Sequence, residues 1–456
     1  MYDTIAATAT PVGAGGIAVI RISGEDAVRI ADRVFSAKMP LSEAQTHTVH
    51  YGYAVDGRGR RIDEVLATVM RAPHSFTRED VVEISTHGGA VASSRVLDAL
   101  ICAGARVAEP GEFTKRAFLN GRIDLSQAEA VIDIINAKNS AAQKNALSQL
   151  GGVLSREIQS ARASLVRLAA QMQVMIDYPD EDLEDITTDE IGETAREVSA
   201  KLKALLRSAD SGRLLRDGIR TVIVGKPNVG KSSLMNLLSG EERAIVTEIA
   251  GTTRDVIEES VTLDGVPLVL IDTAGIHETD DTVEKIGVER SRRSMEGADL
   301  VLVTLDSQSG MGEEDIEVIR ASEGTKRIIL VNKSDLGAAD YIERVRLLAK
   351  DAPVIEISAL TGQGTDDLTE KLREMYRLDF AADGSRAVIT NMRHKTALIK
   401  ADAALVRAYE AIDAKMPPDI VSIDINEAID ALGEITGETV SDSIVSEIFH
   451  SFCVGK

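Results

Sequence analysis

Short apolar runs rich in β-branched residues, separated by glycine and proline, fill the first quarter of the chain. The runs Gly16–Ile22, Glu64–Met70 and Val81–Ser85 predict strands. Apolar positions three and four residues apart predict a helix over Gly89–Ala103. Residues 1–118 are therefore expected to form an α+β domain.

Helical spacing of apolar residues dominates two later parts of the chain. The first part is rich in Ala, Gln, Leu and Lys and is interrupted by the pair Gly151-Gly152. The predicted helical stretches are Ile123–Tyr178, Asp189–Arg216, Lys395–Ala414 and Asp424–Ser451. They predict one helical domain in two halves, residues 119–217 and 380–456.

Between these halves, residues 218–379 alternate short apolar runs with stretches of helical character. Such alternation is typical of a parallel, doubly wound sheet. The predicted strands are Arg220–Val224, Val266–Ile271, Leu300–Leu305, Arg327–Val331 and Val354–Ile357. The expected fold class is thus multidomain, α/β and α, with an α/β domain inserted in a helical domain and preceded by an α+β domain.

Composition and charge limit the partners and the compartment. The 456 residues carry a formal net charge of −22, which opposes diffuse binding to nucleic acid. The two cysteines, Cys102 and Cys453, are too few for a disulfide framework and indicate a reducing compartment. Neither a signal-peptide pattern nor a long uncharged apolar run occurs, so a cytoplasmic protein without a membrane span is expected. Cys102, among apolar neighbours, is expected to be a small core residue.

Residues 225–232 match the phosphate-binding loop G-x-x-x-x-G-K-S, directly after a predicted strand and before a predicted helix. In that pattern, backbone N–H groups meet the phosphates, Lys231 reaches the β and γ oxygens, and Ser232 ligates Mg²⁺. The nucleotide-binding residues expected here are Asn228, Val229, Gly230, Lys231, Ser232 and Ser233.

Three further motifs follow predicted strands. Asp272 can hold Mg²⁺ through water, and Gly275 can offer its N–H to a γ-phosphate. The Asp335 carboxylate can accept two N–H donors from the guanine edge, with the Lys333 stem along the base. The remaining expected nucleotide contacts are Thr247, Thr252, Thr253, Thr273, Ala274, Asn332, Ser358, Ala359 and Leu360. Four motifs in this order predict a GTPase domain.

The segment Gly251–Asp255 lies where a loop that senses the γ-phosphate belongs, with Thr253 as a second Mg²⁺ ligand. In Ras-like enzymes, a Gln shortly after the glycine of this motif orients the attacking water. Here Ile276 follows Gly275 instead. Another group must then supply the positive charge that stabilises the transition state, a contribution of about 10³–10⁵ to the rate of hydrolysis. The Asn228 amide oxygen suits a monovalent cation, although a loop Asn chosen for its backbone conformation explains the residue equally well.

Several motifs outside the nucleotide site are shared with one known family. They are Asp3–Ala7, Ala9–Pro11, Arg21–Gly24, His87–Gly89, Pro110–Gly121, Asp124–Ala130, Tyr178–Asp182 and Cys453–Lys456. With them, the chain resembles the MnmE (or TrmE) family of tRNA modification GTPases over essentially its whole length. The resemblance implies a homodimer formed through an N-terminal domain whose fold is similar to that of tetrahydrofolate-binding enzymes.

The resemblance also implies a reaction. Members act on tRNA with the flavin-containing (FAD) partner MnmG, in a heterotetramer, and build aminomethyl or carboxymethylaminomethyl groups on the 5-position of the wobble uridine. The one-carbon unit comes from a tetrahydrofolate derivative, 5-formyl- or 5,10-methylene-tetrahydrofolate. GTP hydrolysis uses Mg²⁺ and K⁺, and the two G domains pair across the dimer.

Matching positions carry the expected roles in the nucleotide site. The K⁺ ligands would be Asn228, Thr247, Ile249 and Thr252, and the Mg²⁺ ligands Ser232 and Thr253. The catalytic residues would be Lys231, Thr253, Asp272, Gly275 and Glu284. Glu284 either helps to position water or is a first-turn carboxylate that favours its helix dipole.

The folate-binding positions implied by the resemblance are Arg21, Glu83, Arg122 and Lys456. Since Lys456 is the last residue, the C-terminal helix is expected to pack back towards the N-terminal domain. Cys453 either takes a covalent part in one-carbon chemistry or packs the tail beside the folate.

Two other functions share the same nucleotide motifs. A ribosome-assembly or regulatory GTPase would bind RNA or protein without modification chemistry, but the acidic charge and the flanking motifs disfavour it. A nucleotide-binding scaffold that never hydrolyses GTP is disfavoured by the full set of Mg²⁺-binding motifs.

Overall fold

The computed structural model describes residues 3–11, 13–137, 139–177, 188–240, 259–271, 295, 297–337, 339–376 and 387–456. The chain forms two compact units. The first comprises residues 1–132, 149–170 and 426–456, and the second residues 133–148 and 171–425. Four helices contribute residues to both: α4 (Leu125–Asn136), α5 (Ser140–Leu150), α6 (Val153–Asp177) and α15 (Pro418–Thr436).

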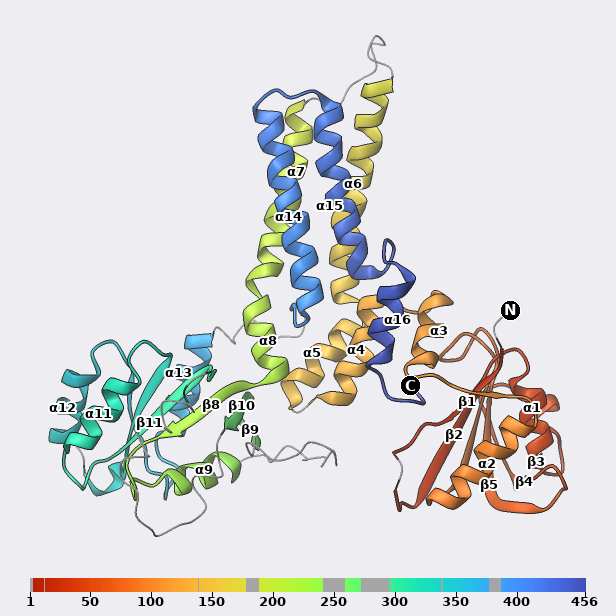
Figure 1. The fold of residues 1–456 in the computed structure, drawn as a ribbon, viewed down its shortest axis with the longest axis horizontal. Coiled ribbons are helices and arrows are strands. Elements are labelled where there is room, and N and C mark those ends of the chain that lie inside the picture. Colours follow the sequence, from red (N-terminus) through yellow and green to blue (C-terminus); the bar gives the residue numbers. More distant parts are fainter. Residues whose placement is uncertain are drawn as a thin grey trace. The chain divides into compact units, whose positions relative to one another are not determined.

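A sheet organises the first unit (Figure 1). It has seven strands in the order β3-β4-β5-β6-β2-β1-β7. The strands are β1 (Ile5–Thr8), β2 (Ile17–Ser23), β3 (Phe35–Ser36), β4 (Thr48–Val55), β5 (Arg61–Met70), β6 (Val81–His87) and β7 (Arg106–Val107). The helices are α1 (Ala27–Val34), the 3-10 turn η1 (Leu41–Glu43), α2 (Ala90–Cys102), α3 (Glu112–Leu119) and α16 (Asp442–His450). Only β1 and β7 pair in parallel among these strands. The predicted α+β character of this part is confirmed.

The two faces of this sheet differ because side chains alternate along each strand. One face packs against α1 and α2, and its core includes Ile20, Val69 and Ile84. The opposite face leaves Tyr51 and Leu66, which pair directly across β4 and β5, 58% and 46% exposed. The second face is thus open over β4 and β5, whereas at β1 it buries Ile5 and Ala7 in a cluster with Phe113 of α3.

Cys102 is exposed, so its prediction as a core residue was wrong. Helix α2 buries Ser93, Val96 and Leu100, which share one face at helical spacing. Cys102 lies two residues beyond Leu100, about 200° around the helix, and therefore on the solvent side.

The predicted helix Asp424–Ser451 is instead two helices, α15 and α16. Helix α15 ends at Thr436, and Gly437 directly after it has a φ of 92°, which favours glycine. A Cβ there would lie 2.8 Å from the Phe118 ring. The turn lets Phe449 and Phe452 of the C-terminal segment join the core formed by α3 and α4.

A six-stranded sheet organises the α/β part of the second unit, in the order β13-β12-β11-β8-β10-β9. Its strands are β8 (Ile219–Val224), β9 (Glu259–Leu263), β10 (Val266–Ile271), β11 (Leu300–Asp306), β12 (Arg327–Asn332) and β13 (Val354–Glu356). Its helices are α9 (Lys231–Gly240), α11 (Glu313–Ala321), η3 (Ser334–Leu336), α12 (Ala339–Ala349) and α13 (Thr365–Tyr376). The sheet is parallel except for β9, which pairs antiparallel with β10. The parallel pairing of the five predicted strands is confirmed, and β9 was not predicted; it joins β10 in a hairpin through a two-residue turn at Asp264 and Gly265.

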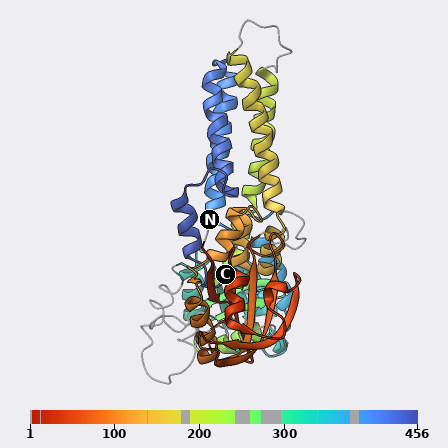
Figure 2. The same ribbon diagram turned by 90° about the vertical axis from the view of Figure 1, so that its right-hand side faces the viewer.

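The helical part of the second unit includes α7 (Thr188–Arg207), α8 (Ala209–Asp217) and α14 (Met392–Asp413). Helices α7 and α14 run side by side (Figures 1 and 2). Both helices bury small residues, among them Ala195 and Ala401, and Ser199 of α7 donates a 2.5 Å hydrogen bond to Asp402 of α14. Among the described residues, no helix is long and apolar enough to span a membrane.

Candidate functional site

The loop predicted to bind phosphate, residues 225–232, connects β8 to α9. A Cβ on Gly225 would lie 2.3 Å from the Thr304 carbonyl oxygen, and one on Gly230 would lie 2.3 Å from Asn332 Nδ2. Both glycines have positive φ, 155° and 96°. Glycine is therefore required at both positions, because neighbouring strands press against the loop backbone.

The Lys231 side chain folds back over this loop. Its Nζ donates to the carbonyl oxygens of Gly225, at 2.9 Å, and Lys226, at 2.7 Å. An ammonium group has three N–H donors, so within the described part of the chain one remains for a ligand. Burial lowers the pKa of Lys231, because the charged form loses hydration. A phosphate oxygen in the loop would compensate for that loss, so the lysine is arranged for an anionic ligand.

Asn332, the last residue of β12, links two loops of the site. It is buried, its Nδ2 donates to the Val229 carbonyl oxygen at 2.8 Å, and its Oδ1 accepts from the Ala359 N–H at 3.0 Å. One side chain thus connects the phosphate loop to residues 358–360, which are predicted to contact guanine.

Asp335 and Leu360 lie on adjacent loops. The Ser334 N–H donates to the Ile357 carbonyl oxygen at 3.2 Å, which holds the two loops together. Asp335 is exposed, and Leu360 is 88% exposed, whereas Ser358 beside it is buried. A carboxylate and an apolar side chain are therefore open to a planar base.

Lys333 is held between these loops and the end of β11. Its φ is 61°, and its Nζ lies 2.7 Å from Asp306 Oδ2. Ser307 donates to the Lys333 carbonyl oxygen at 3.1 Å. These contacts fix the direction of the lysine stem, as packing against a base requires.

Oxygen donors lie exposed at the mouth of the phosphate loop. Ser232 and Ser233 are in the first turn of α9, and Asn228 has a φ of 63°. A hydroxyl oxygen suits Mg²⁺, and an amide oxygen suits a hard monovalent cation. The donor set therefore fits both ions.

The other residues predicted for this site lie outside the described part of the chain. They are Thr247, Ile249, Thr252, Thr253, Asp272, Thr273, Ala274, Gly275 and Glu284. Their roles stay predictions.

Two of the residues predicted to bind folate face each other in the first sheet. Arg21 of β2 lies opposite Glu83 of β6, and Arg21 Nε donates to Glu83 Oε1 at 2.8 Å. The guanidinium lies 5.6 Å from the centroid of the buried Phe113 ring and donates to the Gly455 carbonyl oxygen at 3.2 Å. Arg21 thus joins β2, β6, α3 and the C-terminal tail.

Arg122 lies at the same small apolar cluster as Arg21. Its Nη1 donates to the Phe76 carbonyl oxygen at 2.8 Å, and its guanidinium is 4.8 Å from the Phe76 ring centroid. Phe76 packs against the cluster that contains Phe113. Burial, and then the nearby Arg78, lower the pKa of Arg122. Two cations therefore border one aromatic cluster, an arrangement that suits a flat, polar heteroaromatic ligand.

The C-terminal tail reaches the N-terminal domain, as the position of Lys456 predicts. A Cβ on Gly455 would lie 2.3 Å from the Thr8 carbonyl oxygen, and the Gly111 N–H donates to the Cys453 carbonyl oxygen at 3.4 Å. Cys453 is exposed. Its two predicted roles concern a bound folate and stay predictions.

Two models of known protein families match this chain. A family model described as "GTP-binding protein TrmE N-terminus" matches residues 4–122, and one described as "MnmE helical domain" matches residues 125–453. The chain belongs to the MnmE family.

Curated relatives match over the full length. Proteins named tRNA modification GTPase MnmE are 49% identical in Acetivibrio thermocellus, over 100% of this chain and 99% of that protein, and 50% identical in Listeria innocua, over 100% of both. Among solved structures, Aquifex aeolicus Era bound to GDP·AlF4⁻ is 28% identical, over 41% of this chain and 66% of that one, with a TM-score of 0.27. That structural likeness is too weak to bear on function.

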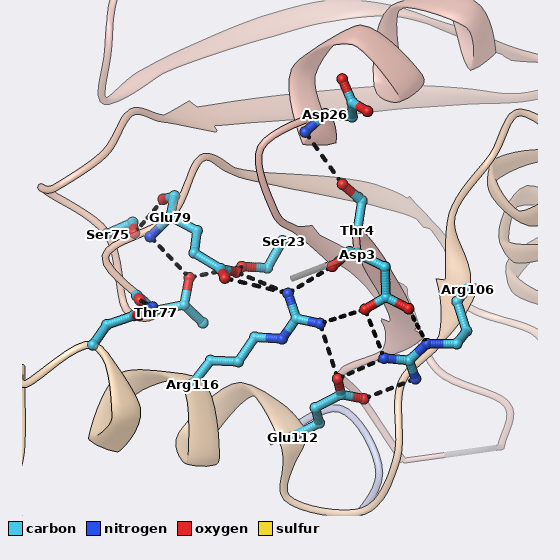
Figure 3. A network of polar contacts seen from close by, with 11 residues as sticks. Asp3, Thr4, Ser23, Asp26, Ser75, Thr77, Glu79, Arg106, Glu112 and Arg116 are labelled. Atoms are coloured by element: carbon cyan, nitrogen blue, oxygen red, sulfur yellow. Dashed lines mark hydrogen bonds and ion pairs between the residues drawn. The ribbon is translucent and has the colours of Figure 1, made fainter. Parts of the chain in front are cut away.

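A polar network around Arg116, in the motif Pro110–Gly121, was not predicted from the sequence (Figure 3). The Arg116 side chain is 3% exposed and pairs with Glu79, at 3.2 Å, and Glu112, at 2.9 Å. It also donates to the Asp3 carbonyl oxygen at 2.7 Å. Arg106 shares two of these partners, at 2.5 Å from Asp3 and 2.8 Å from Glu112. The network ties the start of the chain to α3.

These ion pairs set the charge states of the network. Hydrogen bonds from Arg106 lower the pKa of Asp3 to about 2. Burial alone would raise the pKa of Glu112, but hydrogen bonds from Arg106, the Glu109 N–H and Arg116 outweigh it and lower that pKa. Carboxyl groups with lowered pKa stabilise the fold above their unfolded values, near pH 4, and lose that contribution as the pH falls towards 2.

We expect Arg116→Met to destabilise the N-terminal domain by about 3–5 kcal/mol, because it removes the buried guanidinium that pairs with Glu79 and Glu112. Differential scanning calorimetry of the full chain measures the effect. The loss should shrink as the pH falls from about 6 to 3, where the carboxylates become protonated. Arg29→Met, at an exposed pair with Asp26, is the matched control and should leave the melting temperature unchanged. Equal effects of both variants would contradict this account of the network.

A cavity of about 420 Å³ in the second unit lies away from the phosphate loop. It is lined by the 133–146 segment, α8, the start of β8, Val269 of β10 and Thr390. Two of its arginines already pair with carboxylates, Arg213 with Asp299 at 3.0 Å and Arg216 with Asp133 at 3.3 Å. None of the residues that line the cavity belongs to the nucleotide-binding motifs.

Proposed function

We propose that this chain hydrolyses GTP and that the hydrolysis drives tRNA modification. The observation that carries the GTP site is the Asn332 side chain, which bridges the phosphate loop and the loop beside the exposed Asp335. The names of full-length relatives support the link to tRNA modification.

The chain's own groups have distinct tasks in hydrolysis. Backbone N–H groups of residues 228–232 surround the phosphates, and the remaining Lys231 donor binds the β and γ oxygens. The Ser232 hydroxyl and Thr253 would hold Mg²⁺, which would offset charge on the phosphate oxygens. Asp335 accepts the N1–H and amino group of guanine. These groups stabilise a transition state whose charge lies mainly on the γ-phosphate oxygens.

We propose further that hydrolysis depends on K⁺ held by Asn228 with Thr247, Ile249 and Thr252. The exposed Asn228 oxygen at the mouth of the loop supports this assignment. When bound, K⁺ supplies the positive charge that an arginine finger supplies in other GTPases.

We expect Asn228→Ala to lower K⁺-stimulated GTP turnover by about 10²-fold, comparable to loss of one transition-state donor. Steady-state turnover in KCl and in NaCl measures the effect. Affinity for GDP should change much less, since the cation acts on the γ-phosphate. If the variant is still stimulated by K⁺ as strongly as the parent protein, Asn228 is only a loop residue.

For the N-terminal domain, we propose binding of a tetrahydrofolate derivative by Arg21, Glu83, Arg122 and Lys456. Both contacts of Arg21 with Glu83 fall on Oε1, so among the described residues Oε2 is left for pterin N–H donors. The cations around Phe113 and Phe76 suit the carboxylates and the ring of a folate. The folate supplies the one-carbon unit, and Cys453 lies on the same tail as Lys456.

The remaining proposals concern partners. A second copy would cover the open sheet face around Val49, Tyr51 and Leu66, since exposed apolar groups on one face favour association. The dimer would act in the cytoplasm with MnmG, which carries FAD, on the wobble uridine of tRNA. The G domains would pair across the dimer during hydrolysis, with Glu284 positioning water.

Nucleotide turnover by the purified full-length chain tests the enzymatic proposal. In Mg²⁺ and KCl, we expect release of phosphate from GTP and none above background from ATP. Equal turnover of both nucleotides would contradict guanine recognition by Asp335. Binding of GTP without turnover would leave a nucleotide-binding scaffold and overturn the proposal.

A further inference from the structure

The first half of the phosphate loop is held from outside by an ion pair. Lys226 Nζ lies 2.9 Å from Asp315 Oδ2, and the two side chains are 17% and 0% exposed. Lys226 follows Gly225 directly, and its carbonyl oxygen accepts from Lys231 Nζ. The residue whose backbone positions the catalytic lysine is therefore fixed by its own side chain.

Asp315 belongs to the first turn of α11 and is anchored there. Its Oδ2 also accepts from the Gly312 N–H at 3.0 Å, which caps the helix. Its Oδ1 is buried, and among the described residues it has no hydrogen-bond partner. Lys226 is thus the cation that compensates this buried carboxylate, and the pairing is costly to break.

Other contacts hold the rest of the loop. Thr304 of β11 lies against Gly225, and Asn332 of β12 binds the Val229 carbonyl oxygen. These contacts leave Lys226 as the point at which α11 acts on the loop. Its ammonium is directed to α11, whereas the Lys231 ammonium lies over the loop carbonyls.

We infer that Lys226 and Asp315 form a clamp that holds the phosphate loop in its nucleotide-binding conformation. Lys226 is a positioning residue: it acts through the loop backbone and Lys231, without binding phosphate itself. This inference rests on the proposed function, because it concerns the affinity of the same site for guanine nucleotides. Preorganised backbone donors lose affinity when they are displaced even slightly.

Binding of fluorescent GDP by full-length variants tests the clamp. Lys226→Met, Asp315→Asn and the double variant should each weaken GDP binding by about 10- to 100-fold. The Asn side chain can still accept from the Gly312 N–H, so the helix cap survives in Asp315→Asn. Lys226→Arg, which keeps the pair, should retain near-normal affinity. Glu323→Gln, at the exposed Lys350–Glu323 pair of the same sheet domain, should bind like the parent protein.

The double variant separates positioning from simple stability. If Lys226 only neutralises a buried charge, removing both charges should restore the melting temperature and the GDP affinity together. The clamp predicts a restored melting temperature with affinity still weak. Normal affinity in the double variant would overturn the clamp alone, whereas failure of the parent protein to bind GDP would overturn the proposed function as well.

Discussion

Asp335→Asn is expected to reduce affinity for GTP by about 10³-fold or more and to create affinity for xanthosine triphosphate. The carboxylate accepts two donors from the guanine edge, and a site built for such hydrogen bonds rejects a mismatched base strongly. Xanthine has a carbonyl oxygen where guanine has its amino group. An Asn amide can donate to that oxygen, and the exposed position of Asp335 leaves room for the exchange.

Competition binding with GDP, xanthosine diphosphate and ADP measures this switch. Asp340→Asn, in the neighbouring helix α12, is a matched change of charge that should leave specificity unaltered. If Asp335→Asn lowers binding of guanine and xanthine nucleotides alike, the residue supports the loop and does not read the base.

Lys231→Ala is expected to lower kcat for GTP hydrolysis by about 10²–10³-fold, the usual cost of one lost transition-state donor. Two of the ammonium's donors bind loop carbonyls, and among the described residues the third is left for a phosphate. The charge that it stabilises grows as the γ-phosphate leaves.

Single-turnover hydrolysis at saturating GTP separates this effect from weaker binding. Lys350→Ala removes an exposed lysine of the same domain and should leave turnover unchanged. A Lys231→Ala variant that hydrolyses bound GTP at the parent rate would show that another cation performs this role.

Local sequence patterns predicted much of the α/β domain because its motifs depend on neighbouring residues. The loop Gly225–Ser232 lies between a strand and a helix, as its pattern requires. The missed strand β9 had a local signal as well, since Asp264-Gly265 is a typical two-residue hairpin turn. The strand β4 was harder to recognise, because Gly52 interrupts it. That glycine is needed where a Cβ would meet the Phe35 ring at 2.6 Å.

Contacts between distant parts of the chain could not be derived from local patterns. The hydrogen bond from Arg21 to Gly455 joins residues 434 positions apart, and only the family resemblance suggested that the tail returns to the first domain. The clamp between Lys226 and Asp315 is similar. Neither residue is distinguished in the sequence by its type or spacing, because lysines in loops and carboxylates in the first turn of a helix are common. Their pairing appears only when α11 is placed beside the loop.

The most direct test of the central claim is mass spectrometry of tRNA nucleosides from cells that lack this gene. The account predicts that wobble uridines lose their aminomethyl-type groups at the 5-position and regain them when the intact gene is restored. Restoration with the Lys231→Ala variant should fail. Unchanged wobble nucleosides together with altered ribosome profiles would contradict the account and favour a GTPase of ribosome assembly.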